Sequence, residues 1–179
     1  MGVHPKVKAV FLDRDGVLNK AVIIGGKPFP PKSTNELEIP ECVKEGLTQL
    51  KERGYLLIVI TNQPDVARGT TSLKIVDDIN YYLKQHLILD DIFCCIHDSS
   101  DNCECRKPKP GMIFAAAKKW EIDLSSSFMV GDRWKDIETG KNAGLKTILI
   151  DYGYTEKYDE PDYICPDFIK AIQIIMSLT

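Results

Sequence analysis

The sequence lacks any long hydrophobic run, and this absence limits where the protein can reside. No apolar stretch approaches the roughly 20 residues that a helix needs to span a bilayer. The apolar segment Val7–Leu12 is too short for a signal peptide and is soon followed by charged residues. We therefore expect a cytoplasmic protein with no membrane partner.

An excess of positive charge is also lacking, as is any long run of like charge. Lys and Arg number 23 against 26 Asp and Glu, which gives a formal net charge of −3. Such a chain offers no basic field for nucleic acid, so we expect no nucleic acid partner. Internal repeats and inter-domain linkers are absent too. We expect one domain, 1–179, and a monomer, because the sequence has no evident apolar seam.

Six cysteines are present, and their distribution favours metal binding over disulfides. A reducing cytosol makes a disulfide framework improbable. Four of the six lie within Cys94–Cys105, together with His97, and this clustering is typical of a metal site. Cys42 and Cys165 stand alone, and we expect them to be buried or half-buried small apolar residues.

Short apolar runs rich in Val and Ile alternate with helix-like stretches. The runs have the length and composition of strands at Val7–Leu12, Tyr55–Ile60, Asp91–Ile96, Phe128–Val130 and Thr147–Ile150. Apolar spacing and helix end signals predict helices over Pro40–Arg53, Ser72–His86, Gly111–Trp120, Trp134–Ala143 and Asp167–Met176. This alternation predicts an α/β protein: a three-layer Rossmann-like fold whose mainly parallel central sheet is covered on both faces.

The segment Lys20–Ile39 resists this pattern. It is rich in proline and holds two adjacent glycines, so we expect a long flap loop over 20–39. Neither Asp15–Thr61 nor Asn62–Lys107 has room for a separate cap domain once its helix is assigned. The site should therefore be comparatively open, with selectivity supplied by the flap, by Asn62–Gly69 and by the cysteine-rich loop.

Polar segments follow the predicted strands at the edge of the sheet where ligands bind. In open parallel α/β sheets this edge is the carboxyl end of the strands. A single Asp after a strand is more often a turn or helix-cap residue, but four polar segments in one order favour catalysis. They are Asp13-Arg14-Asp15-Gly16-Val17, Thr61-Asn62-Gln63, Arg106-Lys107-Pro108-Lys109-Pro110-Gly111 and Gly131-Asp132-Arg133-Trp134-Lys135-Asp136.

Asp13 and Asp15 are two residues apart, so both carboxylates can approach one ligand before Gly16 turns the chain. Two carboxylates can divide the labour of hydrolysis. Asp13 would attack phosphorus to give an aspartyl phosphate, and Asp15 would protonate the leaving alkoxide and later activate water.

Carboxylates gathered around a phosphate need a cation, and hard oxygen ligands suit Mg²⁺, with Asp132 as a further ligand. Thr61 offers a hydroxyl and Asn62 a backbone N–H to the phosphoryl oxygens, while Lys107 supplies positive charge. Asp136 lies one helical turn after Asp132, where we expect it to support the metal ligands or to pair with Lys107. Thr-Asn after a strand is otherwise a common turn, and a lysine in a proline-flanked loop is usually solvated.

These four segments resemble, in order, the four motifs of haloacid dehalogenase superfamily phosphatases. The resemblance covers the chain from about Val7 to Ile150. An aspartate two residues after the nucleophile implies hydrolysis of phosphate esters rather than dehalogenation or phosphonate cleavage. The resemblance also implies that Mg²⁺ is held by the carboxylates of Asp13 and Asp132 and by the backbone carbonyl of Asp15.

The cysteine-rich loop, 95–105, predicts a zinc site. Cys95 and His97 form one ligand pair and Cys103 and Cys105 another, and residues i and i+2 of extended backbone project to one side. Together they can close a tetrahedral Cys₃His site, whereas Cys94 points the other way. Four protein ligands leave no open position, so the zinc is structural and would pin the loop that precedes the catalytic lysine. The alternative is a set of reduced thiols without metal.

A narrower resemblance rests on this loop and two further motifs. Cys-x-His followed by Cys-x-Cys-Arg-Lys-Pro-x-Pro-Gly-Met, with Asp-Arg-Asp-Gly and Ala67-Arg68-Gly69, resembles the D-glycero-D-manno-heptose 1,7-bisphosphate phosphatases, a subgroup that also includes histidinol-phosphate phosphatases. The resemblance implies that Arg106 and Arg133 contact substrate. Gln63-Pro64-Asp65 departs from the usual Gln-Ser-Gly, and the cysteine-rich loop is shorter than in many members.

We therefore predict a phosphatase for a small phosphorylated metabolite, with heptose 1,7-bisphosphate first and histidinol phosphate or another sugar phosphate as the alternative. A catalytically silent, zinc-stabilised binding domain is the alternative of another class, and a phosphotransferase lies between them. The arginines could meet a second phosphate, although each could instead be an ordinary surface residue. The residues predicted to bind substrate are Asn62, Gln63, Arg68, Arg106 and Arg133.

Overall fold

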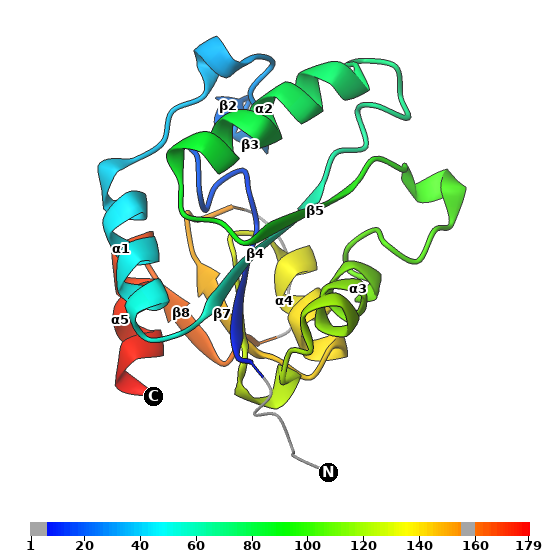
Figure 1. Ribbon diagram of the computed structural model, residues 1–179. Coiled ribbons are helices and arrows are strands. Elements are labelled where there is room, and N and C mark those ends of the chain that lie inside the picture. Colours follow the sequence, from blue (N-terminus) through cyan, green and yellow to red (C-terminus); the bar gives the residue numbers. More distant parts are fainter. Residues whose placement is uncertain (1–6, 155–159) are drawn as a thin grey trace.

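The computed structural model describes residues 7–154 and 160–179. Its centre is a six-stranded sheet in which every neighbouring pair is parallel, in the order β5-β4-β1-β6-β7-β8 (Figure 1). The predicted α/β class is confirmed. The strands are β1 Ala9–Leu12, β4 Leu56–Asn62, β5 Asp91–Cys95, β6 Phe128–Gly131, β7 Lys146–Ile150 and β8 Tyr163–Cys165.

Helices cover both faces of the sheet and make the three-layer arrangement (Figure 1). One apolar core joins the sheet to α1, α2 and α5, and a second core joins it to α3 and the residues after α4. In the described ranges no helix is both long enough and apolar enough to cross a membrane. The helices are α1 Glu41–Glu52, α2 Leu73–His86, α3 Gly111–Trp120, α4 Trp134–Asn142 and α5 Phe168–Ser177, with short 3₁₀ turns η1 Thr34–Glu36, η2 Ser99–Asp101 and η3 Leu124–Ser126.

The two middle strands, β1 and β6, carry no polar side chain because both faces of the sheet are covered. All four residues of β1 and of β6 are buried. Helix starts follow local capping chemistry: the Ser72 side chain accepts a hydrogen bond from the Ile75 N–H at 3.2 Å, and the Asp167 side chain accepts one from the Lys170 N–H at 2.8 Å.

The flap, 20–39, differs from the predicted loop. It contains an antiparallel hairpin, β2 Val22–Ile24 and β3 Lys27–Phe29, with Ile23 opposite Pro28. Gly25 and Gly26 form its turn with φ of 58° and 76°, and two adjacent residues at positive φ suit the twist of a two-residue hairpin. The proline content hid this signal, although a proline is tolerated in a two-stranded ribbon that has only edges. The strand β8 was also not predicted, because three residues are too few to show the alternation of polar and apolar residues that marks a strand.

The chain order through the sheet places a switch point beside β1. From β1 the chain moves outward to β4 and β5, and it then returns to the other side of β1 as β6. The loops after β1, β4 and β6 therefore meet at one edge, where a crevice forms in open α/β sheets. Asp13, Thr61 and Asp132 lie in or directly after these strand ends.

Close packing of α1 on α5 gives a test of the fold. A Cβ added at Gly46 would lie 2.8 Å from Phe168 and 2.9 Å from Ile172. Helix propensity favours alanine by about 1 kcal/mol, but overpacking costs about 1 to 3 kcal/mol. We expect Gly46→Ala to lower the free energy of unfolding, measured by urea denaturation, relative to Glu45→Ala on the exposed face of the same helix. Equal or greater stability of Gly46→Ala would contradict this packing.

Candidate active site

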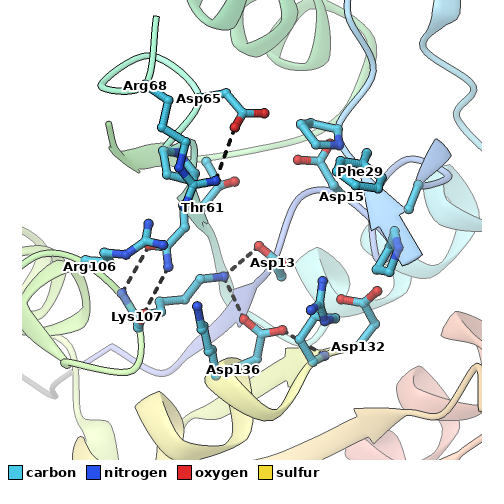
Figure 2. Close-up of a pocket in the computed structure, with 17 residues that line it drawn as sticks. Asp13, Asp15, Phe29, Thr61, Asp65, Arg68, Arg106, Lys107, Asp132 and Asp136 are labelled. Atoms are coloured by element: carbon cyan, nitrogen blue, oxygen red, sulfur yellow. Dashed lines mark hydrogen bonds and ion pairs between the residues drawn. The ribbon is translucent and has the colours of Figure 1, made fainter. Parts of the chain in front are cut away.

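The predicted catalytic residues converge in one cavity at the carboxyl ends of β1, β4 and β6 (Figure 2). Arg68 and Arg106 lie on one side of it in this view and Phe29 of the hairpin on the other. The structure thus brings together side chains that are separated by more than a hundred residues in the sequence. The cavity is lined by Asp13, Asp15, Ala21, Pro28, Phe29, Pro30, Thr61, Asn62, Pro64, Asp65, Arg68, Arg106, Lys107, Asp132, Arg133, Lys135 and Asp136.

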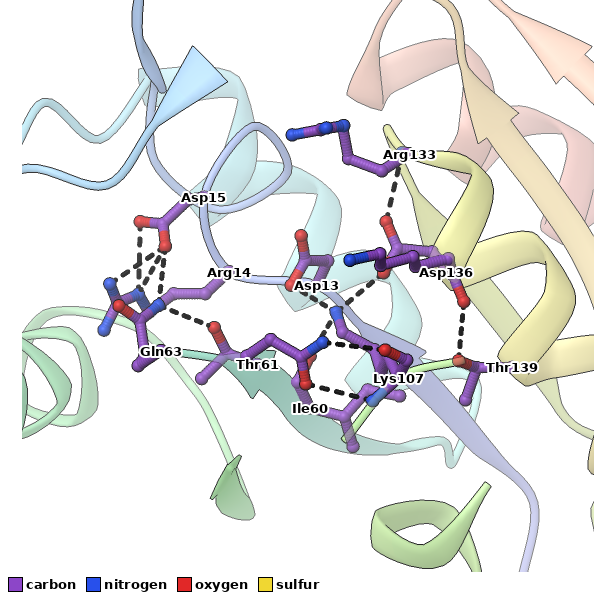
Figure 3. Close-up of polar contacts among 12 residues, drawn as sticks. Asp13, Arg14, Asp15, Ile60, Thr61, Gln63, Lys107, Arg133, Asp136 and Thr139 are labelled. Atoms are coloured by element: carbon purple, nitrogen blue, oxygen red, sulfur yellow. Dashed lines mark hydrogen bonds and ion pairs between the residues drawn. The ribbon is translucent and has the colours of Figure 1, made fainter. Parts of the chain in front are cut away.

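Lys107 lies at the centre of the polar contacts (Figure 3). Its ammonium donates to Asp13 Oδ1 and to Asp136 Oδ1, both at 2.6 Å, and to the backbone carbonyl of Ile60 at 3.0 Å. The lysine is only 3% exposed, so these three acceptors replace its water. The predicted pairing of Asp136 with Lys107 is present.

Asp132 has the opposite character. Its side chain is buried and neither carboxylate oxygen has a hydrogen-bond partner. Carboxylate oxygens of Asp13, Asp132 and Asp136 lie within 4.8 Å of one another. A buried, unpartnered carboxylate is costly unless a cation satisfies it, so the donor set fits a hard divalent metal ion. Gly16 leaves room for this arrangement, because a Cβ there would lie 2.1 Å from Asp132 Oδ2.

The electrostatics of the cluster follow from burial and like charge. Burial and the neighbouring Asp136 raise the pKa of Asp13 to about 7, although Lys107 opposes the rise. Burial, Asp13 and Asp136 raise the pKa of Asp132 well above its usual range. Burial disfavours the ammonium of Lys107, but the two carboxylates outweigh it and raise its pKa. Fully ionised, the cluster would hold more negative charge than one lysine can balance.

Asp15 lies apart from this cluster and has hydrogen-bond partners of its own (Figure 3). Arg14 donates to it from Nε and Nη2, at 3.2 Å and 2.9 Å, and Asn19 and Gln63 donate at 3.0 Å and 2.8 Å. Burial alone would raise the pKa of Asp15, but these donors lower it below its ordinary value. The carboxylate is thus held in its ionised form. The roles of Arg14 and Asn19, and the hydrogen bond from Arg14 to Asn80 on α2, were not predicted, since nothing in their spacing marks them.

The residues at the carboxyl end of β4 divide into two roles. Thr61 lines the cavity, and the Asn62 side chain pairs with the backbone N–H and carbonyl of Lys107, both at 3.0 Å. Gln63 was predicted to bind substrate, but it is buried and does not line the cavity. Its amide donates to Asp15 and, at 2.9 Å, to Thr61. The structure therefore places Gln63 behind the site rather than in it.

Each of the three predicted arginines reaches the cavity wall, and further residues join them. Arg68, Arg106 and Arg133 all line the cavity. Sequence reasoning missed Phe29, Asp65 and Lys135, together with the prolines beside Phe29. Phe29 and Asp65 do lie in segments that we expected to supply selectivity, the flap and Asn62–Gly69, and Lys135 lies within the last of the four polar segments.

The cysteine-rich loop gathers the four predicted ligands. Cys105 Sγ lies 3.0 Å from Cys95 Sγ, 3.5 Å from Cys103 Sγ and 3.3 Å from His97 Nδ1, and all four donor atoms lie within 4.8 Å of one another. Tetrahedral zinc with metal–sulfur distances of about 2.3 Å has ligand atoms roughly 3.5 to 4 Å apart, so the set fits such an ion. Cys94 lies outside the group, and the lone Cys42 and Cys165 are half-buried and buried, as predicted.

Comparisons with known proteins agree with this geometry. A family model described as HAD-hydrolase-like matches residues 104–171. The crystal structure of D,D-heptose 1,7-bisphosphate phosphatase from B. bronchiseptica, complexed with magnesium and phosphate, superposes with a TM-score of 0.81 at 27% identity, covering 97% of this chain and 100% of that one. Fold and site thus define a HAD-like hydrolase.

Two sequence relatives narrow the class. D-glycero-β-D-manno-heptose-1,7-bisphosphate 7-phosphatase of Helicobacter pylori is 37% identical over 94% of this chain and 97% of its own length. D-glycero-α-D-manno-heptose-1,7-bisphosphate 7-phosphatase of Photorhabdus laumondii is 40% identical over 84% of this chain and 86% of its own length. The chain belongs to the HAD-like family of heptose 1,7-bisphosphate 7-phosphatases, which are phosphoric monoester hydrolases.

The raised pKa of Asp13 predicts how the stability of the metal-free protein depends on pH. Between 3.8, its ordinary value, and about 7 the native state binds more protons than the unfolded state. Stability therefore rises as the pH falls through this window, and Asp132 adds to the trend. We expect a higher melting temperature at about pH 5 than at about pH 7.5 in excess chelator, with a smaller rise in Asp132→Asn.

The control for this measurement is Asp78→Asn, which removes an exposed carboxylate on α2. It should keep the pH dependence of the unaltered protein. A melting temperature that falls steadily from about pH 7.5 to about pH 5 in the metal-free protein would contradict the prediction.

Proposed function

We propose that this enzyme removes the 7-phosphate of D-glycero-D-manno-heptose 1,7-bisphosphate through an aspartyl phosphate on Asp13. The observation that carries the proposal is the buried pair Asp13 and Asp132, one carboxylate bonded to Lys107 and the other without a partner. The pair lies in the fold of a family whose named members act on this substrate.

In the first half-reaction a carboxylate oxygen of Asp13 attacks phosphorus, and the bond from phosphorus to the sugar oxygen breaks. Lys107 favours the ionised form of Asp13, against the effect of burial, and adds positive charge where the transferring phosphoryl group gathers negative charge. Asp15 is ionised while Arg14 and Gln63 donate to it, so it first leaves these donors and takes up a proton from solvent. It then gives that proton to the leaving oxygen and becomes a carboxylate again.

In the second half-reaction Asp15 takes a proton from water, and the resulting hydroxide attacks phosphorus. The bond from phosphorus to Asp13 breaks and inorganic phosphate leaves. Mg²⁺ held by the carboxylates of Asp13 and Asp132 and by the Asp15 carbonyl would neutralise the phosphoryl oxygens. Thr61 lines the cavity at a position where its hydroxyl can meet them.

The substrate assignment also draws support from the shape and charge of the cavity. Arg68, Arg106 and Arg133 give it a cationic wall, which suits a second phosphate beyond the one that is cleaved. The side chain of Phe29 and its neighbouring prolines offer an apolar surface to the sugar. We propose that the hairpin replaces a cap domain and that the enzyme acts as a cytoplasmic monomer with one domain.

A substrate panel tests this function. With Mg²⁺, we expect release of one phosphate from heptose 1,7-bisphosphate, with kcat/KM at least about tenfold above that for histidinol phosphate or hexose phosphates. Both anomers should be included, since the relatives differ in this respect. Asp13→Asn should lower kcat by about 10³-fold or more with little change in fold, because the nucleophile is lost. A reversed ranking would refute the substrate, and an active Asp13→Asn would refute the mechanism.

The cysteine-rich loop supports a second proposal, a structural zinc held by Cys95, His97, Cys103 and Cys105. Its position two residues before Lys107 would let it fix the loop that carries the lysine. Four protein ligands would leave no site for substrate, so the ion would act on stability rather than on the reaction.

Metal content and stability test the zinc proposal. Protein purified without added metal should carry about one zinc per chain, and a strong chelator or Cys105→Ser should lower the melting temperature by about 5 °C or more. Cys94→Ser is the matched control, because this neighbouring cysteine lies outside the ligand group. Absence of zinc, or equal losses in the two serine variants, would contradict the site.

A further inference from the structure

Asp98 joins two arginines of the cavity wall without lining the cavity itself. The Arg68 guanidinium donates to it through Nε at 2.9 Å and Nη2 at 2.7 Å, a two-point contact. Arg106 Nη2 lies 3.7 Å from the same carboxylate. The arginines come from different segments, one after β4 and one after the cysteine-rich loop, so Asp98 bridges them.

Asp98 is itself fixed by the backbone around it. Its side chain accepts a hydrogen bond from the Ser99 N–H at 2.7 Å, and its own N–H donates to Asp101 at 2.7 Å, which caps the 3₁₀ turn η2. It directly follows His97, whose carbonyl accepts a hydrogen bond from Arg106 at 3.1 Å. The carboxylate is therefore fixed in position and can hold the two arginine side chains in place.

The contact with Asp98 restricts the conformations of the arginine side chains. The Arg68 side chain is 46% exposed, and a long exposed side chain loses considerable rotamer freedom when it binds a ligand. A two-point contact with a carboxylate removes that freedom before the ligand arrives. It occupies two of the five guanidinium donors, and a third, on Nη1, lies 3.4 Å from Asp65 Oδ1. The remaining N–H groups of the planar fork are left for a phosphate.

We propose that Asp98 is a positioning residue that holds Arg68 and Arg106 ready for the phosphate that is not cleaved. The proposal rests on the proposed function, because it assigns these arginines to the 1-phosphate of the bisphosphate. Asp98 thereby sets the preference for a bisphosphate over a monophosphate, although it touches neither the substrate nor the reacting atoms.

The test compares heptose 1,7-bisphosphate with heptose 7-phosphate, which presents the same scissile bond without the 1-phosphate. Asp98→Ser keeps a side chain that can cap η2 but is too short to reach the arginines. Its preference, the ratio of the two kcat/KM values, should fall about tenfold, with the loss in the KM for the bisphosphate. Asp98→Asn keeps the capping group and the side-chain length but not the charge. Its preference for the bisphosphate should lie between that of Asp98→Ser and that of the unaltered enzyme.

Two further measurements separate positioning from loop stability. In a double-mutant cycle with Arg68→Ala, the losses of preference should not add, because Asp98 acts through the arginine. Asp101→Asn weakens the same cap without touching either arginine, so it should keep the preference. If the serine variant fails to fold, the asparagine variant carries the comparison.

Retained preference in the Asp98 variants, or additive losses with Arg68→Ala, would overturn this inference and leave the proposed function intact. Equal losses on both substrates would also overturn it, since they would show damage to the common chemistry. Unaltered enzyme that does not favour the bisphosphate would overturn the substrate assignment together with this inference, before any variant is compared.

Discussion

The buried ammonium of Lys107 is the interaction on which the rest of the site depends. Asp13 and Asp136 could not lie so close together without it, since like carboxylates in a poorly hydrated space repel strongly. One lysine does not balance three such groups, and Asp132 is left without a partner. This excess of carboxylates lies where a metal ion can supply the missing positive charge and bind the phosphoryl group.

Several parts of the fold serve to hold that lysine. The carbonyl of Ile60 in β4 accepts a hydrogen bond from its ammonium, and the Asn62 side chain hydrogen-bonds to its backbone N–H and carbonyl. Before it lies the cysteine-rich loop, and after it Gly111 packs so closely that a Cβ there would lie 2.2 Å from the Glu104 carbonyl. The order β4, β1, β6 then places Asp13 and Asp132 on adjacent strands beside it.

Much of the fold could be predicted because buried parallel strands are uniformly apolar and helix ends carry local signals. Gly111–Trp120 matches its predicted bounds, and each end of the other predicted helices lies within one residue of its prediction. The prediction of a loop over Lys20–Ile39 was wrong, because the segment contains a hairpin. Its prolines outweighed the turn signal of Gly25-Gly26. The function of Gln63 could not be predicted, since its partners Asp15 and Thr61 are chosen by burial.

The sequence by itself determined the strand-and-helix alternation, the two acidic motifs, Lys107 and the paired Cys and His residues of the cysteine-rich loop. These features are local, because each rests on residue types at short fixed spacing. Only the tertiary structure decided that Asp132 is unpartnered, that Asp15 is held by Arg14, and that Asp98 ties Arg68 to Arg106. Partners this distant in the chain are selected by packing and by the scarcity of water around buried charge, and neither leaves a pattern in the sequence.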